Sequence, residues 1–255
     1  MSAAPLWYWA ALAGVLGLCV GSFSTVAVSR WPAGESLVRP RSRCTTCART
    51  LGPAELVPVL SWLALRARCR GCGSRISWTY PAIELASGAL AAAAILSFGP
   101  TWEGAAAAIL GLALVPVVVI DLRHRLIPDV IVLPAAVLGL AVATAADPAR
   151  WWVYLSAAAG AAGFLLLLAL VHPGGMGLGD VKLALLLGGV LGASVVPALA
   201  IAFGIGAALG VVALVRFGPA ARKMAIPFGP FLAAGALAAL WLGPAMIGWY
   251  AERLA

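Results

Sequence analysis

The amino-acid sequence predicts an all-α polytopic membrane protein with about eight transmembrane helices and a small cytoplasmic insert after the first helix. Its composition points this way, because 63% of the 255 residues are apolar and only 10% are Asp, Glu, Lys or Arg. Soluble domains carry about 25% charged residues. The mean hydropathy is +1.03, and long uncharged stretches recur along the chain. These features exclude an ordinary soluble enzyme, a disordered regulator and a disulfide-rich secreted domain.

The uncharged stretches mark the expected spans, because about 20 apolar residues cross the hydrocarbon core of a bilayer as a helix. There are seven such stretches, and the sixth is too long for one comfortable span. A turn at residues 192–197 divides it into two helices, which gives eight. The stretches cover residues 5–29, 85–102, 104–120, 130–146, 151–179, 183–215 and 224–251.

The basic residues predict the orientation of these spans. Nine of the 17 are arginines between Arg30 and Arg75. Eight spans with both termini outside place all basic residues inside the cell except Arg150 and Arg253, as the positive-inside rule favours. Seven spans would move the last basic cluster outside. A sequence pI near 9.9 is also typical of nucleic-acid-binding proteins. No nucleic-acid motif is present, however, so we expect a lipid bilayer and no nucleic acid as partner.

The polar insert, residues 30–80, carries two C-x-x-C pairs. Each pair can present two thiolates from one tight turn, and two such turns complete a tetrahedral Zn²⁺ site. Two disulfides or a redox role are the alternatives, and a reducing cytoplasm disfavours disulfides. Four cysteine ligands leave no open position, so the zinc is expected to be structural. Residues 1–29 are then the first transmembrane helix and residues 81–255 a seven-helix domain. The expected ligands are Cys44, Cys47, Cys69 and Cys72, while Cys19 is expected to pack within the first span.

Three of the nine acidic residues lie at the expected cytoplasmic ends of spans: Asp121, Asp129 and Asp180. Ionisable groups at such positions are costly and therefore indicate function. Asp129 directly follows Pro128 at the start of a helix, where the helix dipole stabilises a carboxylate. This structural role suffices for Asp129, so the first candidates are Asp121, which closes the third helix, and Asp180, which opens the sixth. Two carboxylates at one depth can share a proton, so that one activates water while the other protonates a carbonyl, as in aspartic proteolysis.

Taken together, these residues resemble the type IV prepilin peptidase family, the GxGD-type aspartic proteases of the cell membrane. The resemblance extends over nearly the whole chain. In chain order it rests on Gly21-Ser-Phe23, Arg30-Trp-Pro32, the two cysteine pairs with Pro58-Val-Leu-Ser-Trp62 between them, Tyr80-Pro81-x-x-Glu84, Asp121 before Ile127-Pro128-Asp129, Gly177-x-Gly179-Asp180-x-Lys182, and Pro227-Phe-Gly-Pro230.

The resemblance implies that Asp121 and Asp180 are catalytic and that the enzyme removes the short basic leader of prepilin or pseudopilin substrates at the cytoplasmic membrane face. The longer form of the family, marked by the cysteine domain, also N-methylates the new N-terminus with S-adenosylmethionine. Thr25 stands where the family commonly has Asn, which bears on methyl transfer. Contacts to the substrate are expected from Gly177, Gly179, Asp129, Glu84 and Lys182.

Two other interpretations remain open at this point. A signal-peptide-peptidase-like intramembrane protease also uses Gly-x-Gly-Asp, but its aspartates would lie deep within the spans and it would not need the cysteine insert. A polytopic transporter would use Asp121 and Asp180 as a cation relay. A pilin-like substrate encoded nearby would separate these interpretations from the peptidase.

Overall fold

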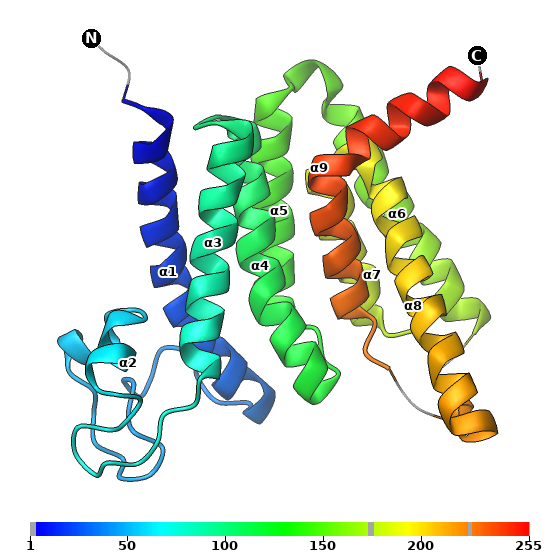
Figure 1. Cartoon of the computed structure of the whole chain (residues 1–255). Helices are drawn as coiled ribbons and strands as arrows, with labels where there is room; N and C mark the ends of the chain where they lie inside the picture. Colours follow the sequence, from blue (N-terminus) through cyan, green and yellow to red (C-terminus); the bar gives the residue numbers. More distant parts are fainter. Residues whose placement is uncertain (1–3, 173–175, 224–225, 255) are drawn as a thin grey trace. The chain divides into compact units, whose positions relative to one another are not determined.

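The computed structural model describes residues 4–172, 176–223 and 226–254, and within them the chain is mainly helical (Figure 1). A short helix, α2 (Leu60–Ala64), lies in the insert between the first two long helices. The described residues contain eight long helices: α1 (Leu6–Arg30), α3 (Thr79–Phe98), α4 (Trp102–His124), α5 (Asp129–Ala146), α6 (Trp151–Val171), α7 (Leu178–Leu191), α8 (Val195–Phe217) and α9 (Gly229–Leu254).

The expected division of the sixth stretch is confirmed. By length and composition the described residues give seven candidate membrane spans, and one of them, Leu178–Ala220, is 43 residues long. It is broken into α7 and α8 at Gly192, whose φ of 54° is in the left-handed region that favours glycine. As a 14-residue helix, α7 extends only about 21 Å. It is therefore shorter than a bilayer core of about 30 Å.

Several helix boundaries differ from the sequence-based expectation. The fifth span was expected over residues 151–179, but α6 ends at Val171, and α7 begins at Leu178 rather than at residue 183. The second long helix begins at Thr79 rather than at residue 85, and α4 continues to His124 instead of ending at residue 120. The expected spans were cut at charged residues, whereas Glu84 and Asp121 lie inside their helices with a backbone N–H bound to each carboxylate. The expected start of the last span, Met224, lies outside the described residues.

The chain forms two compact units, Met1–Val119 and Ile120–Ala255, and α4 runs from the first into the second. In the first unit, α1 packs closely along α3 (Figure 1). Small residues allow this approach: a Cβ on Gly17 would lie 2.7 Å from the carbonyl oxygen of Ser87, and one on Gly21 would lie 2.8 Å from Cα of Glu84. Close packing of small residues is the usual basis of helix association in membranes. The packing of α1 on α3 holds the two ends of the insert close together.

The second unit is built on the helix pairs α6–α7, α8–α9 and α5–α7. Gly188 of α7 lies against Ala157 of α6, and Gly235 of α9 lies against Ala198 of α8. Large apolar side chains fill the interior between these helices, among them Leu165, Leu183, Leu186, Leu187 and Leu232, each with no exposed surface. This packing brings the C-terminal end of α4 and the N-terminal ends of α7 and α9 to the same end of the unit.

Candidate active site and metal centre

Asp121 lies near the C-terminal end of α4 and is only 5% exposed. Its Oδ2 accepts a buried hydrogen bond of 2.9 Å from the backbone N–H of Gly229, which is 108 residues further along the chain and begins α9. A Cβ at position 229 would lie 2.6 Å from this oxygen, closer than real Cβ atoms approach. The backbone of α9 is therefore pressed directly against the carboxylate.

Asp180 lies in the first turn of α7 and is 8% exposed. Its Oδ2 accepts a hydrogen bond of 3.1 Å from the backbone N–H of Gly177, and its own N–H donates to the carbonyl oxygen of Gly177 at 3.1 Å. The Asp180 carboxylate acts as the third residue of a capping box does, with the Gly177 carbonyl in place of an N-cap side chain. The first turn of a helix also stabilises a negative charge. The expected position of Asp180 at the start of a helix is confirmed.

The two carboxylates lie at the same end of the second unit, Asp121 near the C-terminal end of α4 and Asp180 in the first turn of α7. Two buried negative charges close together repel each other strongly, and sharing one proton removes one of the charges. Each is held by a glycine N–H, which fixes the direction of the carboxylate without covering it with another side chain. Such a pair can activate water with one carboxylate and protonate a carbonyl with the other.

Asp129 and Lys182 form an ion pair beside these carboxylates. The Lys182 ammonium donates to both carboxylate oxygens of Asp129, at 2.8 and 2.7 Å, and so joins α5 to α7. Gly179 lies against Ile127 in the loop before α5, where a Cβ would lie 2.8 Å from Cβ of Ile127. Asp129 begins α5, as expected, but sequence analysis did not identify its partner. The pair fixes the loop before α5 against the first turn of α7.

Glu84 lies in the second turn of α3, within the first unit, and is 7% exposed. Its Oε2 accepts a hydrogen bond of 2.7 Å from the backbone N–H of Val59. Val59 has a φ of 61°, which is unfavourable for a β-branched residue. The structure thus connects Glu84 to the segment that leads into α2. Val59 belongs to the Pro58–Trp62 motif, but the motif did not predict this contact. Thr25 is 7% exposed, and its hydroxyl donates to the carbonyl oxygen of Ser22 in its own helix.

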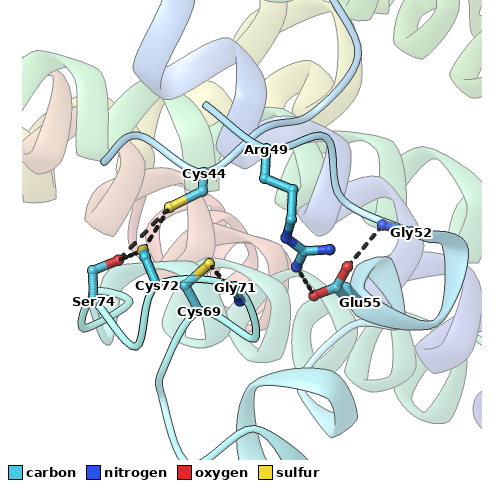
Figure 2. A network of polar contacts seen from close by, with 8 residues as sticks. All are labelled: Cys44, Arg49, Gly52, Glu55, Cys69, Gly71, Cys72 and Ser74. Carbon is cyan, nitrogen blue, oxygen red and sulfur yellow. Dashed lines mark hydrogen bonds and ion pairs between the residues drawn. The ribbon is translucent and has the colours of Figure 1, made fainter. Parts of the chain in front are cut away.

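The four expected cysteines of the insert come together. Figure 2 shows three of them, Cys44, Cys69 and Cys72. Their sulfur atoms all lie within 4.8 Å of one another, and Sγ of Cys44 is 3.8 Å from Sγ of Cys72. A tetrahedral zinc with bonds of about 2.3 Å requires sulfur atoms about 3.8 Å apart. None of the four cysteines is joined in a disulfide, so the geometry fits a metal site. Cys19 lies in α1 and is not part of the cluster.

The two halves of the cluster repeat the same backbone structure at an offset of 25 residues. The N–H of Cys44 donates to the carbonyl oxygen of Arg49, and that of Cys69 donates to Ser74. Two residues after the first cysteine of each half, a backbone N–H donates to the Sγ of that cysteine at 3.4 Å. Isolated β-bridges close both turns, Arg43 with Thr50 and Arg68 with Arg75. Each half thus presents its two sulfur atoms from a preformed turn.

These donors favour thiolates in the cluster. The backbone N–H groups of Cys47 and Thr46 lower the pKa of Cys44 to about 5. The Ser74 hydroxyl lowers the pKa of Cys72. The backbone of Arg49 acts to lower the pKa of Cys47, but the neighbouring thiols and desolvation outweigh it and raise that pKa to about 11. Metal ligation requires thiolates, and the lowered pKa values of Cys44 and Cys72 favour this form.

Arg49 and Glu55 form an ion pair that stabilises the insert. Sequence analysis missed both residues because Arg and Glu are common on protein surfaces. The Arg49 guanidinium pairs with Glu55, and this pairing, together with the N–H of Gly52, lowers the pKa of Glu55 (Figure 2). The Arg49 side chain also crosses Gly71 between the second pair of cysteines, where a Cβ would lie 2.9 Å from Nε. One side chain therefore joins both turns to the segment that precedes α2.

Comparisons with known proteins agree with these observations. Residues 15–98 match a family model described as the bacterial peptidase A24 N-terminal domain, and residues 108–214 match one described as the type IV leader peptidase family. Several curated relatives carry the name prepilin leader peptidase/N-methyltransferase. One from Bacillus subtilis (strain 168) is 40% identical over 244 residues, covering 92% of this chain and 95% of the relative.

Two further relatives of the same name are similar over most of their length. One from Burkholderia pseudomallei (strain 1026b) is 40% identical over 281 residues, covering 95% of this chain and 88% of the relative. One from Pseudomonas aeruginosa is 35% identical over 257 residues, covering 89% and 88%. No solved structure matches the chain.

Proposed function

Because the chain belongs to the type IV leader peptidase family, it is a multi-pass membrane peptidase that removes leader peptides and N-methylates the new N-terminus, and we propose that Asp121 and Asp180 are its catalytic carboxylates. The observation that carries this proposal is the pair of buried carboxylates at one end of the second unit, each oriented by a glycine N–H. These relatives do not favour the signal-peptide-peptidase-like protease or the transporter.

The proposed reaction needs one ionised and one protonated carboxylate. The ionised carboxylate takes a proton from water as the water oxygen attacks the scissile carbonyl carbon, while the protonated one gives its proton to the carbonyl oxygen. The tetrahedral intermediate then loses its C–N bond as the leaving amine takes up the proton that was removed from water, and one hydroxyl of the intermediate returns a proton to the second carboxylate. The hydrogen bonds from Gly229 and Gly177 hold one oxygen of each carboxylate, which reduces the number of orientations available to the other.

The substrates that we propose are prepilin or pseudopilin proteins with a basic leader, cleaved at the cytoplasmic face of the cell membrane. The positive-inside distribution of Lys and Arg supports this side for the insert and for the carboxylates. Gly177 and Gly179 place no side chain of their own beside Asp180, and Asp129, Glu84 and Lys182 supply charges. We retain these five residues as proposed substrate contacts. We propose three functional parts: the first transmembrane helix (residues 1–29), the zinc-binding insert (residues 30–80) and the seven-helix peptidase domain (residues 81–255).

Two further groups belong to the proposal. Cys44, Cys47, Cys69 and Cys72 would hold a zinc ion, whose four thiolate bonds stabilise the fold of the insert without an open catalytic position. S-adenosylmethionine is the proposed methyl donor. It supplies an electrophilic methyl group, which the new N-terminal amine accepts as it loses a proton. The fit of the sulfur geometry to zinc supports the first assignment.

A single assay tests the function as a whole. Purified protein in lipid is incubated with a synthetic prepilin N-terminus and S-adenosylmethionine, and the products are identified by mass spectrometry. The expected products are the free leader and a stem peptide with one added methyl group on its first residue. An intact prepilin would contradict the peptidase assignment, and a cleaved but unmethylated stem would contradict only the second activity.

A further inference from the structure

The segment before and within α2 exposes an apolar patch, which we define as Leu56, Val57, Leu60 and Leu63. Their exposed fractions are 41%, 42%, 66% and 58%. Leu60 and Leu63 are three residues apart on α2 and therefore share a face of this helix. A cluster of exposed large apolar side chains in a polar insert indicates contact with another apolar surface.

The contact between Glu84 and Val59 fixes the level of this patch relative to the membrane. The 20 residues of α3 extend about 30 Å, the thickness of the hydrocarbon core, so Thr79 lies at its boundary. Glu84 lies five residues further, about 7.5 Å inside α3. The N–H of Val59, the residue directly before α2, donates to Glu84 at 2.7 Å. Figure 1 accordingly shows α2 beside the end of the α1–α3 pair. The patch therefore lies at the level of the bilayer interface.

The surrounding charge specifies the kind of surface. Nine arginines lie between Arg30 and Arg75, against two acidic residues, Glu35 and Glu55. The charge of Glu55 is already paired with Arg49. A short segment with apolar residues on one face and many arginines around it is typical of interfacial membrane anchors, and anionic phospholipids attract such basic segments. A second copy of the chain would carry the same positive charge and would be repelled.

We propose that α2 and the residues before it form an interfacial anchor, which inserts its apolar patch into an anionic bilayer surface. Glu84 holds this anchor at the correct depth. The strained φ of Val59 is then maintained by its hydrogen bond to Glu84 and by the burial of the neighbouring leucines in lipid. The anchor keeps the cysteine cluster at the membrane surface beside α3. This assignment is independent of the catalytic role of Asp121 and Asp180.

Photocrosslinking in the full-length protein tests the anchor. The photoreactive residue p-benzoylphenylalanine replaces Leu63 or, as a matched control, the exposed polar Thr50 of the first cysteine turn. The protein is reconstituted in vesicles of phosphatidylglycerol with phosphatidylethanolamine or of phosphatidylcholine alone. After illumination, mass spectrometry is expected to show several-fold more lipid adduct at position 63 than at position 50, and more with phosphatidylglycerol. Equal adducts at both positions, or adducts at position 63 only with protein, would overturn the proposal.

The role of Glu84 is tested in the same assay. Glu84→Ala removes the acceptor for the N–H of Val59 and is expected to reduce the lipid adduct at position 63 several-fold. Glu84→Gln keeps a carbonyl oxygen as acceptor and is expected to retain it. Thermal melting of each variant verifies that the membrane helices remain folded. An unchanged adduct in Glu84→Ala, or the same loss in Glu84→Gln, would contradict a positioning role of this hydrogen bond.

Discussion

Asp121 and Asp180 receive their hydrogen bonds from backbone N–H groups of glycines rather than from side chains. A backbone donor has no rotamer freedom, so the orientation of each carboxylate depends on the position of a helix. Asp121 lies near the C-terminal end of α4, where the helix dipole disfavours a negative charge, and the N-terminus of α9 offsets this through Gly229. The precision of the proposed site therefore depends on how α9 packs.

A methyl group at position 229 is expected to disturb the proposed site. In Gly229→Ala, the new Cβ would meet Oδ2 of Asp121 at 2.6 Å, so the carboxylate must move. Prepilin cleavage is expected to lose about tenfold or more in kcat, which corresponds to about 1.4 kcal/mol of activation free energy, with little change in KM. Gly248→Ala in the same helix, with no atom within 4 Å, is the matched control. A wild-type kcat in Gly229→Ala would show that Asp121 does not need this contact.

Loss of the ion pair between Asp129 and Lys182 is expected to have a smaller effect. Both side chains are partly exposed, 50% and 38% respectively, and exposed ion pairs contribute about 0–1 kcal/mol. Asp129→Asn is therefore expected to slow leader removal by less than about tenfold. Initial cleavage rates at saturating prepilin provide the measurement. A loss as large as that of a proposed catalytic aspartate would assign Asp129 a direct role in the reaction.

At the scale of elements, the cysteine insert consists of two copies of one turn that share a site. Each turn carries its own N–H donors to sulfur, and Arg49 joins them. A module of this size has a small apolar core, so metal bonds supply much of its folding free energy. The long helices have their own packed interior and do not depend on the metal in this way.

The metal content of the purified protein tests this account of the insert. We expect about one zinc per chain, bound by four thiolates, as measured by elemental analysis. Joint replacement of Cys44 and Cys47 by Ser is expected to release the metal, while Cys19→Ser in α1 keeps it. Thermal melting is expected to leave the membrane helices nearly unchanged in both variants. A metal-free wild-type protein with free thiols or disulfides at these four positions would contradict the zinc site.

At the scale of the whole molecule, the two proposed activities belong to different parts of the chain. The proposed peptidase carboxylates lie in the second compact unit, and the cysteine insert lies in the first. The resemblance that the sequence carries associates the insert with methyl transfer. Disruption of the cysteine pairs is therefore expected to impair N-methylation more than cleavage. Mass spectrometry of the mature pilin N-terminus decides this, and a fully methylated product from the double-Cys variant would contradict the assignment.

The sequence was sufficient for the helices and for the short-range motifs. An apolar span of about 20 residues has few alternatives to a membrane helix, and a C-x-x-C pair brings its own two sulfur atoms together. The contacts that link Asp121, Asp129 and Glu84 to distant parts of the chain were not predictable. Gly229 reaches Asp121 across 108 residues, Lys182 reaches Asp129 across 53, and Val59 reaches Glu84 across 25. These contacts between residues distant in sequence form only when the helices pack, and no local sequence pattern predicts them.

The central claim is that Asp121 and Asp180 act as one catalytic pair. The most direct measurement is the rate of leader removal from a prepilin substrate by Asp121→Asn, Asp180→Asn and the double variant, each purified in lipid with its melting temperature recorded. An amide can neither take nor give the shared proton. We therefore expect each single variant to be folded and to have lost cleavage as completely as the double variant. Cleavage near the wild-type rate by either single variant would contradict the account.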